Sequence, residues 1–482
     1  MDKIRTRFAP SPTGYMHIGN LRTALYEYLI AKSQGGDFIL RIEDTDRSRY
    51  VEGAEEVIYS TLKAVGLRHD EGPDIGGNYG PYIQSERKGE YLTYAKKLVE
   101  KGDAYYCFCE KSDTDEGHLE SGHKDICRNL TDSEIKENLK AHKSYVIRQK
   151  TPEYGITKFD DLVFGEVKIE NKEIEDQILI KSDGYPTYNF ANVIDDHEMQ
   201  ITHVVRGCEY LSSTPKYNLL YESFGWEKPT YIHLPLIMGK NEDGSISKLS
   251  KRHGAVSFED LIKMGYLPEA IINYIAFLGW CPESNREIFS LRELEHEFSA
   301  KRISKSPAVF DYKKLDWFNS EYIKSKSVRE FVDLAQPYIA PMLGDMKLSV
   351  EKISMLLQNR ISKLSEIPDL IDFFGQLPIY GTELFINKKS KTDKEISENV
   401  LKEIKEKLSE LETWNYDSLH DLLIDYAKKN ELKNGTVMWP VRIAISGKTT
   451  TPGGAIEILE ILGKDESLSR IDKAISLLKG EK

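Results

Sequence analysis

The chain has 482 residues, of which 40% are hydrophobic and 30% are charged, and its formal net charge is −12. This length exceeds what one hydrophobic core supports, so we expect several domains of a globular protein. No apolar run approaches membrane-spanning length, and the first four residues lead directly into a predicted strand, so we expect neither a membrane span nor a signal peptide.

The first segment alternates strand and helix patterns. Residues 4–8 alternate apolar and polar side chains, and apolar residues then recur at helical spacing over 21–29. Residues 38–42 have the composition of a second strand, and 54–65 the spacing of a second helix. This alternation predicts a parallel sheet covered by helices over residues 1–87.

Between the first strand and the first helix lies the string RFAPSPTGYMHIGN, residues 7–20. A loop of small residues that leads into a helix N-terminus offers backbone N–H groups and the positive end of a dipole, which suits phosphate. An ordinary strand–turn–helix connection explains this loop equally well, because proline and glycine punctuate turns in general.

A different texture interrupts the alternation over residues 88–187, with one helix, a cysteine segment and short strands at 145–148 and 177–180. We interpret this stretch as an inserted domain. The sheet resumes with a strand at 202–207 and closes with the apolar run 231–238. Ligands of doubly wound sheets bind at the carboxyl ends of strands, so Arg7, Glu43 and Arg206, which lie at or near such ends, are expected to share a pocket.

The string KLSKR, residues 248–252, follows the polar stretch 239–245. A flexible basic loop at the end of a strand can move onto a pyrophosphate and neutralise its charge in the transition state. The strings at 7–20 and 248–252 together predict a site that binds a triphosphate from two sides.

Beyond residue 251 the patterns become helical, with clear amphipathic helices near 267–278 and 419–427. The charged stretch 387–394 is typical of a linker between helical bundles. Lysine and arginine outnumber acids over 301–329, but a solvated helix face accounts for such a run as well, so charge alone does not establish a nucleic-acid partner.

Further strings complete a resemblance: RIEDTD at 41–46, GPYIQSER at 80–87, DGYPTY at 183–188, NVIDDH at 192–197 and FDYKKLDW at 310–317. With RFAPSPTGYMHIGN and KLSKR, they resemble the class I aminoacyl-tRNA synthetases, and within them the bacterial glutamyl-tRNA synthetase family. Asn20 stands where many class I enzymes carry a second histidine, and Arg252 where they carry serine. Both variations fit this subfamily.

The resemblance implies a Rossmann-type doubly wound parallel sheet with an inserted α+β domain for the acceptor end of tRNA, followed by all-helical anticodon-binding bundles. The expected domains are the catalytic halves 1–87 and 188–245, the insert 88–187, a stem-contact region with the lysine loop at 246–325, and helical bundles at 326–385 and 386–482. A helical C-terminal third argues against glutaminyl enzymes, which use β-barrels there, and against a short relative that modifies a tRNA base.

The implied activity is that of a glutamate–tRNA ligase, which forms glutamyl-adenylate from ATP and L-glutamate and transfers glutamate to the 3′-terminal adenosine of tRNA(Glu), releasing AMP and diphosphate. The implied cofactor is ATP with Mg²⁺, and the protein is expected to be a cytoplasmic monomer. A synthetase-like protein without catalysis, which only binds tRNA or a partner, is the alternative from another class. Whether tRNA for glutamine is also charged stays open, with Gln358 in the helical region that would face the anticodon.

The resemblance also assigns site residues. The catalytic candidates are His17, Lys248 and Lys251. The ATP-binding candidates are Pro12, Thr13, Gly14, His17, Gly19, Asn20, Lys248, Ser250 and Lys251. The glutamate-binding candidates are Arg7, Ser11, Glu43, Tyr188, Asn192 and Arg206.

Within the glutamate set, a side-chain carboxylate calls for a guanidinium, because arginine offers a rigid bidentate fork and a permanent charge. The resemblance gives Arg7 to the side-chain carboxylate, Arg206 to the α-carboxylate and Glu43 to the α-ammonium group. For Glu43, a surface salt bridge within residues 41–44 is the alternative.

The chain has five cysteines, too few for a disulfide framework, so we expect a reducing compartment. Cys107, Cys109 and Cys127 resemble the Cys-x-Cys…Cys-x-His zinc site of some bacterial relatives, but Asn129 stands at the histidine position. His118, His123 or Asp125 are candidate fourth ligands of a structural Zn²⁺. Buried thiols that act as small hydrophobes are the alternative.

Overall fold

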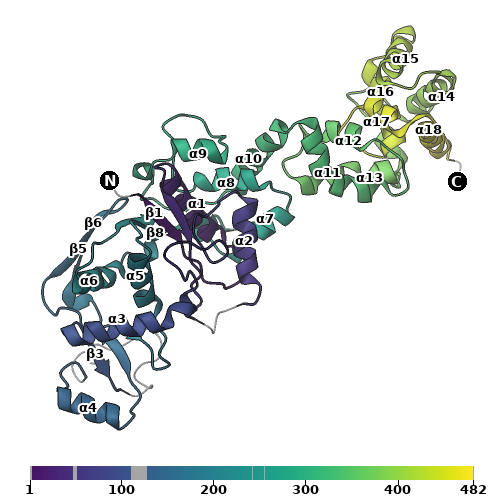
Figure 1. Ribbon diagram of the computed structural model, residues 1–482. Coiled ribbons are helices and arrows are strands. Elements are labelled where there is room, and N and C mark those ends of the chain that lie inside the picture. The colour runs from purple at the N-terminus through teal and green to yellow at the C-terminus, as the bar shows by residue number, and fades with distance from the viewer. Residues whose placement is uncertain (1–2, 47–50, 110–126, 242, 255, 481–482) are drawn as a thin grey trace. The chain divides into compact units, whose positions relative to one another are not determined.

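The computed structural model describes residues 3–46, 51–109, 127–241, 243–254 and 256–480. The chain forms two compact units, Met1–Ile262 with Pro268–Lys314, and Lys263–Leu267 with Leu315–Lys482 (Figure 1). No helix in the described ranges is long and apolar enough to cross a membrane. The domain limits predicted from the sequence remain predictions.

The centre of the first unit is a set of parallel strands. Strands β1 (Arg5–Phe8) and β2 (Asp37–Leu40) pair in parallel, as do β8 (His203–Gly207) and β9 (Thr230–Leu234). The Thr202 N–H donates to the Arg5 carbonyl at 3.0 Å, which joins β1 to the start of β8. The predicted α/β fold is confirmed, although the hairpin of β5 (Ile156–Asp161) and β6 (Gly165–Glu170) is antiparallel and extends the sheet through β9.

Helix α1 (Ile18–Lys32) packs against this sheet and is covered on nearly every side, since 11 of its 15 residues are buried. Two of the buried residues, Arg22 and Glu27, are charged. Buried charges require partners, so α1 contributes polar groups to the floor of a site as well as apolar packing. Helices α2 (Ala54–Ala64), α5 (Tyr188–Glu198) and α6 (Thr214–Phe224) complete this region (Figure 1).

The predicted insert contains a small antiparallel sheet of its own. Strand β4 (Val146–Gln149) lies between β3 (Ala104–Cys107) and β7 (Ile178–Ile180). Helix α3 (Lys88–Lys101) packs against β3 and β7 through Leu98 and its neighbours, and α4 (Asp132–Lys140) follows the cysteine segment. The hairpin β5–β6 also falls within the predicted insert, yet it pairs with the catalytic strand β9.

The lysine string, KLSKR at residues 248–252, begins in a more ordered segment than the sequence predicts. Pro235 divides the apolar run 231–238 into β9 and β10 (Ile237–Lys240), since proline cannot continue a strand ladder. Strand β11 (Ile246–Lys248) pairs with β10 in an antiparallel hairpin, and β12 (Ala308–Val309) pairs with β10 on its other edge. The prediction of a simple flexible loop is therefore wrong for Lys248, which ends a strand.

Helices α7 (Phe258–Lys263), α8 (Pro268–Ala276), α9 (Leu291–Glu297) and α10 (Tyr312–Ser325) follow the hairpin. Apart from one isolated β-bridge, the regular elements in the described residues of the second unit are helices. They include α11 (Val328–Leu343), α12 (Val350–Leu357), α13 (Ile367–Gly375), α14 (Lys394–Glu410), α15 (Tyr416–Lys429), α16 (Asn434–Ser446), α17 (Ala455–Leu462) and α18 (Lys464–Lys479). The helices predicted near 267–278 and 419–427 are confirmed as α8 and α15.

Two contacts show how the second unit is tied together. Arg470, 1% exposed, donates to the carbonyl oxygens of Phe373 and Ile445, so one guanidinium joins α18 to α13 and α16. Thr392 donates to the Phe385 carbonyl at 2.8 Å and pairs with Asn387. The charged stretch that the sequence predicts as a linker thus begins with a hydrogen-bonded turn inside this unit.

Candidate functional site

A cavity of about 520 Å³ opens where β1, β8 and the N-terminal part of α1 meet. Predicted site residues that line it are Arg7, Ser11, Thr13, His17, Gly19, Asn20, Glu43, Tyr188, Arg206 and Lys248. Among the described residues, Pro12, Gly14, Asn192 and Ser250 do not line it. The backbone of Lys251 begins a short 3₁₀ turn, but its side chain lies outside the described part of the chain.

His17 lies at the N-cap of α1, with its backbone in the extended region. The Gly19 N–H donates to its Nδ1 at 2.9 Å, so the proton of the neutral imidazole resides on Nε2. Burial, and then the charge of Lys248, lower the pKa of His17. His17 therefore offers the cavity a neutral N–H donor beside a lysine.

Gly19 suits this cap, because a Cβ there would lie 3.1 Å from Nδ1 of His17 and the ring would have to shift. The Ile18 N–H donates to the Val256 carbonyl, which ties the first string to the chain that follows the lysine string. The first two N–H groups of α1 are thus already occupied, so this helix end is less open to phosphate than the sequence predicts.

The ring of His253 holds the lysine hairpin together. The Ser250 N–H donates to its Nδ1 at 3.0 Å, and its Nε2 lies 2.9 Å from Oδ1 of Asn241. A Cβ on Gly239 would come within 2.5 Å of this ring, so glycine allows the ring to close against β10. These contacts hold the segment that carries Lys248 at the cavity.

Arg7 is 4% exposed and already has two acidic partners. Its Nε donates to Asp196 at 2.9 Å, and its NH1 to Glu27 at 3.1 Å. Burial alone would lower the pKa of Arg7, but the Asp196 and Glu27 carboxyl groups raise it. Burial raises the pKa of Glu27 well above its ordinary value, and Oε2 of Glu27 has no hydrogen-bond partner in the described residues.

Arg41 is fully buried and pairs with acidic residues near the floor of the cavity. Its NH2 lies 3.0 Å from Glu43, and its NH1 lies 2.9 Å from Asp196. Asp195 binds the nearby Arg87 at 2.8 Å. Glu43 is therefore part of a buried network rather than of a surface salt bridge.

The raised pKa of Glu43 predicts that the affinity for an amino-acid substrate depends on pH. Burial raises its pKa to about 7, against the lowering effect of the Arg41 and Arg7 charges. If Glu43 pairs with the ammonium group of an amino acid, the KM for that amino acid should rise up to about tenfold per pH unit below pH 7, as the carboxylate gains a proton. The measurement is KM between about pH 6 and 8, with the KM for ATP as the control. A flat profile would contradict this role.

Arg206 differs from Arg7 in its surroundings. It is 6% exposed and lines the cavity, but within the described part of the chain it forms no ion pair. Its guanidinium carbon lies 4.5 Å from the ring centre of Tyr217, 5.4 Å from that of Tyr231 and 5.5 Å from that of Tyr210. Aromatic rings hold a cation in place without neutralising its charge, so Arg206 can bind an anionic ligand in the cavity.

Two further predicted residues lie on α5. Tyr188 lines the cavity, and burial, followed by the charge of Glu43, raises the pKa of its phenol, which keeps the hydroxyl a donor. Asn192 is 2% exposed, and its Nδ2 lacks a hydrogen-bond partner among the described residues. Asn192 therefore lies close to the floor of the site without reaching the cavity surface.

Sequence reasoning missed Glu27, Arg41, Asp195 and Asp196 as parts of the site. Arg41 and the two aspartates belong to strings that support the resemblance. Arg41 directly follows the apolar end of β2, and the two aspartates follow apolar residues on α5. A charged residue next to an apolar run was the available signal. Glu27 gave no such signal, because the spacing of apolar residues in α1 does not show that this helix is covered on nearly every side.

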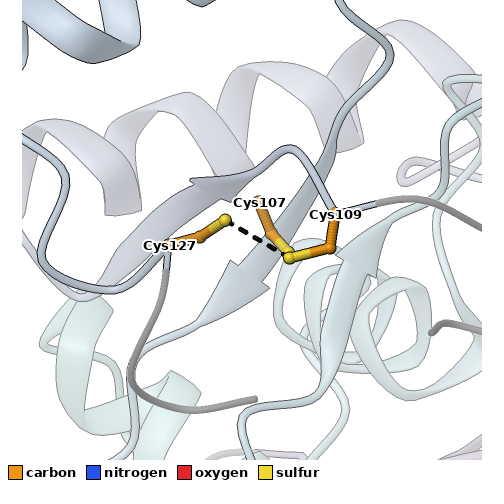
Figure 2. Close-up of side chains that lie close together, drawn as sticks. All are labelled: Cys107, Cys109 and Cys127. Atoms are coloured by element: carbon orange, nitrogen blue, oxygen red, sulfur yellow. Dashed lines mark hydrogen bonds between the residues drawn. The ribbon is translucent and has the colours of Figure 1, made fainter.

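The three clustered cysteines converge where β3 ends (Figure 2). Their sulfur atoms all lie within 4.8 Å of one another, and the Cys109 and Cys127 sulfurs are 3.5 Å apart. Tetrahedral zinc with bonds of about 2.3 Å separates two sulfurs by roughly 3.8 Å, so the cluster fits three corners of such a site. Burial opposes it, but the Cys109 N–H and Arg148 lower the pKa of Cys107, which favours the thiolate.

The fourth corner is not defined by the described residues. Asn129 is exposed in the turn after Cys127. His118, His123 and Asp125, the alternatives predicted from the sequence, lie outside the described residues.

Gln358, which the sequence analysis places in the region that would face the anticodon, donates through Nε2 to the carbonyl oxygens of Ile323 and Lys326, at 3.1 and 2.7 Å.

Comparison with known families matches residues 3–317 to the tRNA synthetases class I (E and Q), catalytic domain, and residues 330–475 to an anticodon binding domain. A glutamate–tRNA ligase of Clostridium kluyveri is 56% identical over 100% of this chain and 99% of its own length, and one of Clostridium tetani is 55% identical over the same shares. The crystal structure of a glutamate tRNA ligase from Elizabethkingia meningosepticum, in complex with its amino acid, has a TM-score of 0.90 and 36% identity, with 99% of this chain and 100% of that one covered.

Proposed function

The chain belongs to the glutamate–tRNA ligases of the class I tRNA synthetase family, and we propose that its cavity activates glutamate with ATP and passes the glutamyl group to tRNA(Glu). One cavity holds Arg206 and Glu43, which suit the charged groups of an amino acid, beside His17 and Lys248, which suit phosphate. This combination carries the proposal, because adenylate formation requires an amino acid and a nucleotide in contact.

In the first step a carboxylate oxygen of glutamate attacks the α-phosphorus of ATP. A new P–O bond forms, the bond to the β-phosphate breaks, and pyrophosphate leaves with its electron pair. The protein supplies positioning and charge neutralisation rather than covalent chemistry. His17 donates its Nε2–H to a phosphate oxygen, while Lys248 and Lys251 face the β- and γ-phosphates.

Mg²⁺, when bound, would neutralise the same phosphates, and we assign it no protein cage because phosphate and water supply most of its ligands. In the second step the 2′-hydroxyl of the terminal tRNA ribose attacks the glutamyl carbonyl, and AMP leaves. No protein nucleophile is required. The second unit, which matches an anticodon binding domain, would bind the far end of tRNA(Glu). We propose that the protein works as a monomer in the cytoplasm, where its substrates are found.

Lysine 251 provides the test of the activation step. Lys251→Ala should slow adenylate formation about 10²- to 10³-fold, because it removes a charge contact that strengthens in the transition state. The measurement is ATP–pyrophosphate exchange with tRNA(Glu) present, at saturating ATP. Lys240→Ala is the matched control, since Lys240 is exposed on the same hairpin but does not line the cavity. Normal exchange in Lys251→Ala would refute the role of the string.

The cysteine cluster supports a second proposal, that this enzyme carries one structural zinc ion in its insert. The stretch 110–125 has almost no apolar residues to fold it, so metal binding would supply folding free energy there. Protein purified without a histidine tag or added zinc should contain about one zinc per chain, and Cys109→Ser should lose it. Cys281→Ser, which changes an exposed cysteine elsewhere, is the control. Zinc-free protein with full activity would rule the site out.

A further inference from the structure

Behind Arg206, and outside the lining of the cavity, lies a buried aspartate–histidine pair. Asp161 is 3% exposed, and all of its acceptor capacity is engaged. Its Oδ1 accepts from the N–H groups of Val163 and Phe164, at 3.0 and 2.8 Å. Its Oδ2 accepts from the backbone N–H of His233 at 3.0 Å and lies 2.6 Å from Nδ1 of the same residue. The carboxylate is thus fixed in place and aimed at the imidazole.

This contact determines which nitrogen of His233 carries the proton. The side chain of His233 is fully buried, and burial lowers its pKa, so the ring is neutral. Nδ1 faces the Asp161 carboxylate, an acceptor, so the proton resides on Nδ1 and Nε2 has a free lone pair. Nε2 lies 3.2 Å from Nε of Arg206, which donates to it.

Thr214 is consistent with the same assignment. Its hydroxyl donates to the Tyr210 carbonyl at 2.8 Å and accepts from NH2 of Arg206 at 2.9 Å. Oγ1 of Thr214 also lies 3.2 Å from Nε2 of His233, but its single proton is used in the shorter contact with the Tyr210 carbonyl, so the lone pair of His233 is left for Arg206. A guanidinium has five N–H groups, so two are held from behind and three remain for a ligand.

We propose that Asp161 and His233 are positioning residues that hold the Arg206 guanidinium with its remaining N–H groups directed at a carboxylate of the amino-acid substrate. This inference rests on the proposed function, in which Arg206 binds that carboxylate. A carboxylate in place of His233 would also orient Arg206, but it would form an ion pair with it and compete with the substrate. Arg7, whose charge is shared with Asp196 and Glu27, shows such ion pairing. A neutral acceptor orients the guanidinium and leaves its charge for the ligand.

Two substitutions test separately the donor Nδ1 and the acceptor Nε2 of His233. His233→Asn retains an N–H near Asp161 but loses the acceptor for Arg206, whereas His233→Gln places an amide oxygen near the former Nε2. His233→Asn should raise the KM for glutamate about 10- to 100-fold and leave the KM for ATP within about twofold, because only the amino-acid subsite is misaligned. His233→Gln should restore most of the affinity. His203→Asn, at the start of β8, is the matched control.

A purely structural role would give a different result, with similar losses of stability in the Asn and Gln variants and parallel changes for both substrates. The tautomer is tested without any substitution, by ¹⁵N NMR of protein labelled at histidine, with His233→Gln identifying the signal. Protonated Nδ1 and bare Nε2 support the inference, and a proton on Nε2 overturns it. An unchanged glutamate KM in folded His233→Asn overturns it too. Failure of the unaltered protein to charge tRNA with glutamate would instead refute the proposed function.

Discussion

Replacing Arg206 with glutamine should lower kcat/KM for glutamate by about 10³- to 10⁴-fold, because a buried site built around a guanidinium loses both the charge and the directed donors that the substrate carboxylate requires. The fold should be retained. Arg206 forms no ion pair in the described residues, so its removal leaves no buried acid unpaired. The measurement is aminoacylation of tRNA(Glu) at varied glutamate, with the KM for ATP as the internal control.

Arg206→Lys is the companion variant. Lysine keeps a positive charge but lacks the planar fork and the Nε–H that meets His233, so it should recover only a small part of the lost activity. A KM for glutamate within threefold of the unaltered enzyme in Arg206→Gln would place the carboxylate elsewhere in the cavity.

Replacing Arg7 with glutamine should damage both activity and stability. The residue is the candidate for the glutamate side-chain carboxylate, so kcat/KM should fall by about 10³-fold or more. In addition, among the described residues Glu27 loses its ion-pair partner and Asp196 keeps only Arg41, which should lower the free energy of unfolding by about 3–5 kcal/mol. Urea unfolding and glutamate kinetics on the same preparation separate the two effects.

Arg5→Gln is the matched control for that experiment. Arg5 lies two residues earlier on β1, is 8% exposed and pairs with Asp37 and Glu71, away from the cavity. We expect it to lose a comparable amount of stability and to keep the KM for glutamate. If Arg7→Gln resembles Arg5→Gln in both respects, Arg7 supports the fold only and takes no part in binding the side chain.

Local patterns predicted most of the elements around the site. The alternation before the first string became β1, the helical spacing after it became α1, and His17 lies at the boundary that the pattern predicts. The helical C-terminal third is likewise confirmed. These features depend on neighbours in sequence, which is why periodicity and turn residues were sufficient to locate them.

The charge balance of the site could not be predicted in this way. Arg7 and Arg206 look alike in the sequence, each an arginine near the carboxyl end of a predicted strand. Their difference arises from long-range contacts, with Glu27 and Asp196 beside Arg7 and with His233 beside Arg206. Burial of α1 on nearly every side, which places Glu27 there, is a property of tertiary packing.

The lysine hairpin was missed for a related reason. The stretch 239–245 is polar and contains two glycines, which favours a loop, but β11 pairs with β10 and the ring of His253 contacts Asn241. Tertiary contacts of this kind override local propensity.

The central claim is tested most directly by charging of tRNA(Glu) with radiolabelled amino acid by the purified protein. With ATP and Mg²⁺ present, labelled glutamate should appear in acid-precipitable tRNA, the label should require ATP, and labelled glutamine should not be incorporated. Parallel samples with tRNA for glutamine define the range of tRNA substrates. Absence of glutamyl-tRNA(Glu) under these conditions, or charging with glutamine in place of glutamate, would contradict the account.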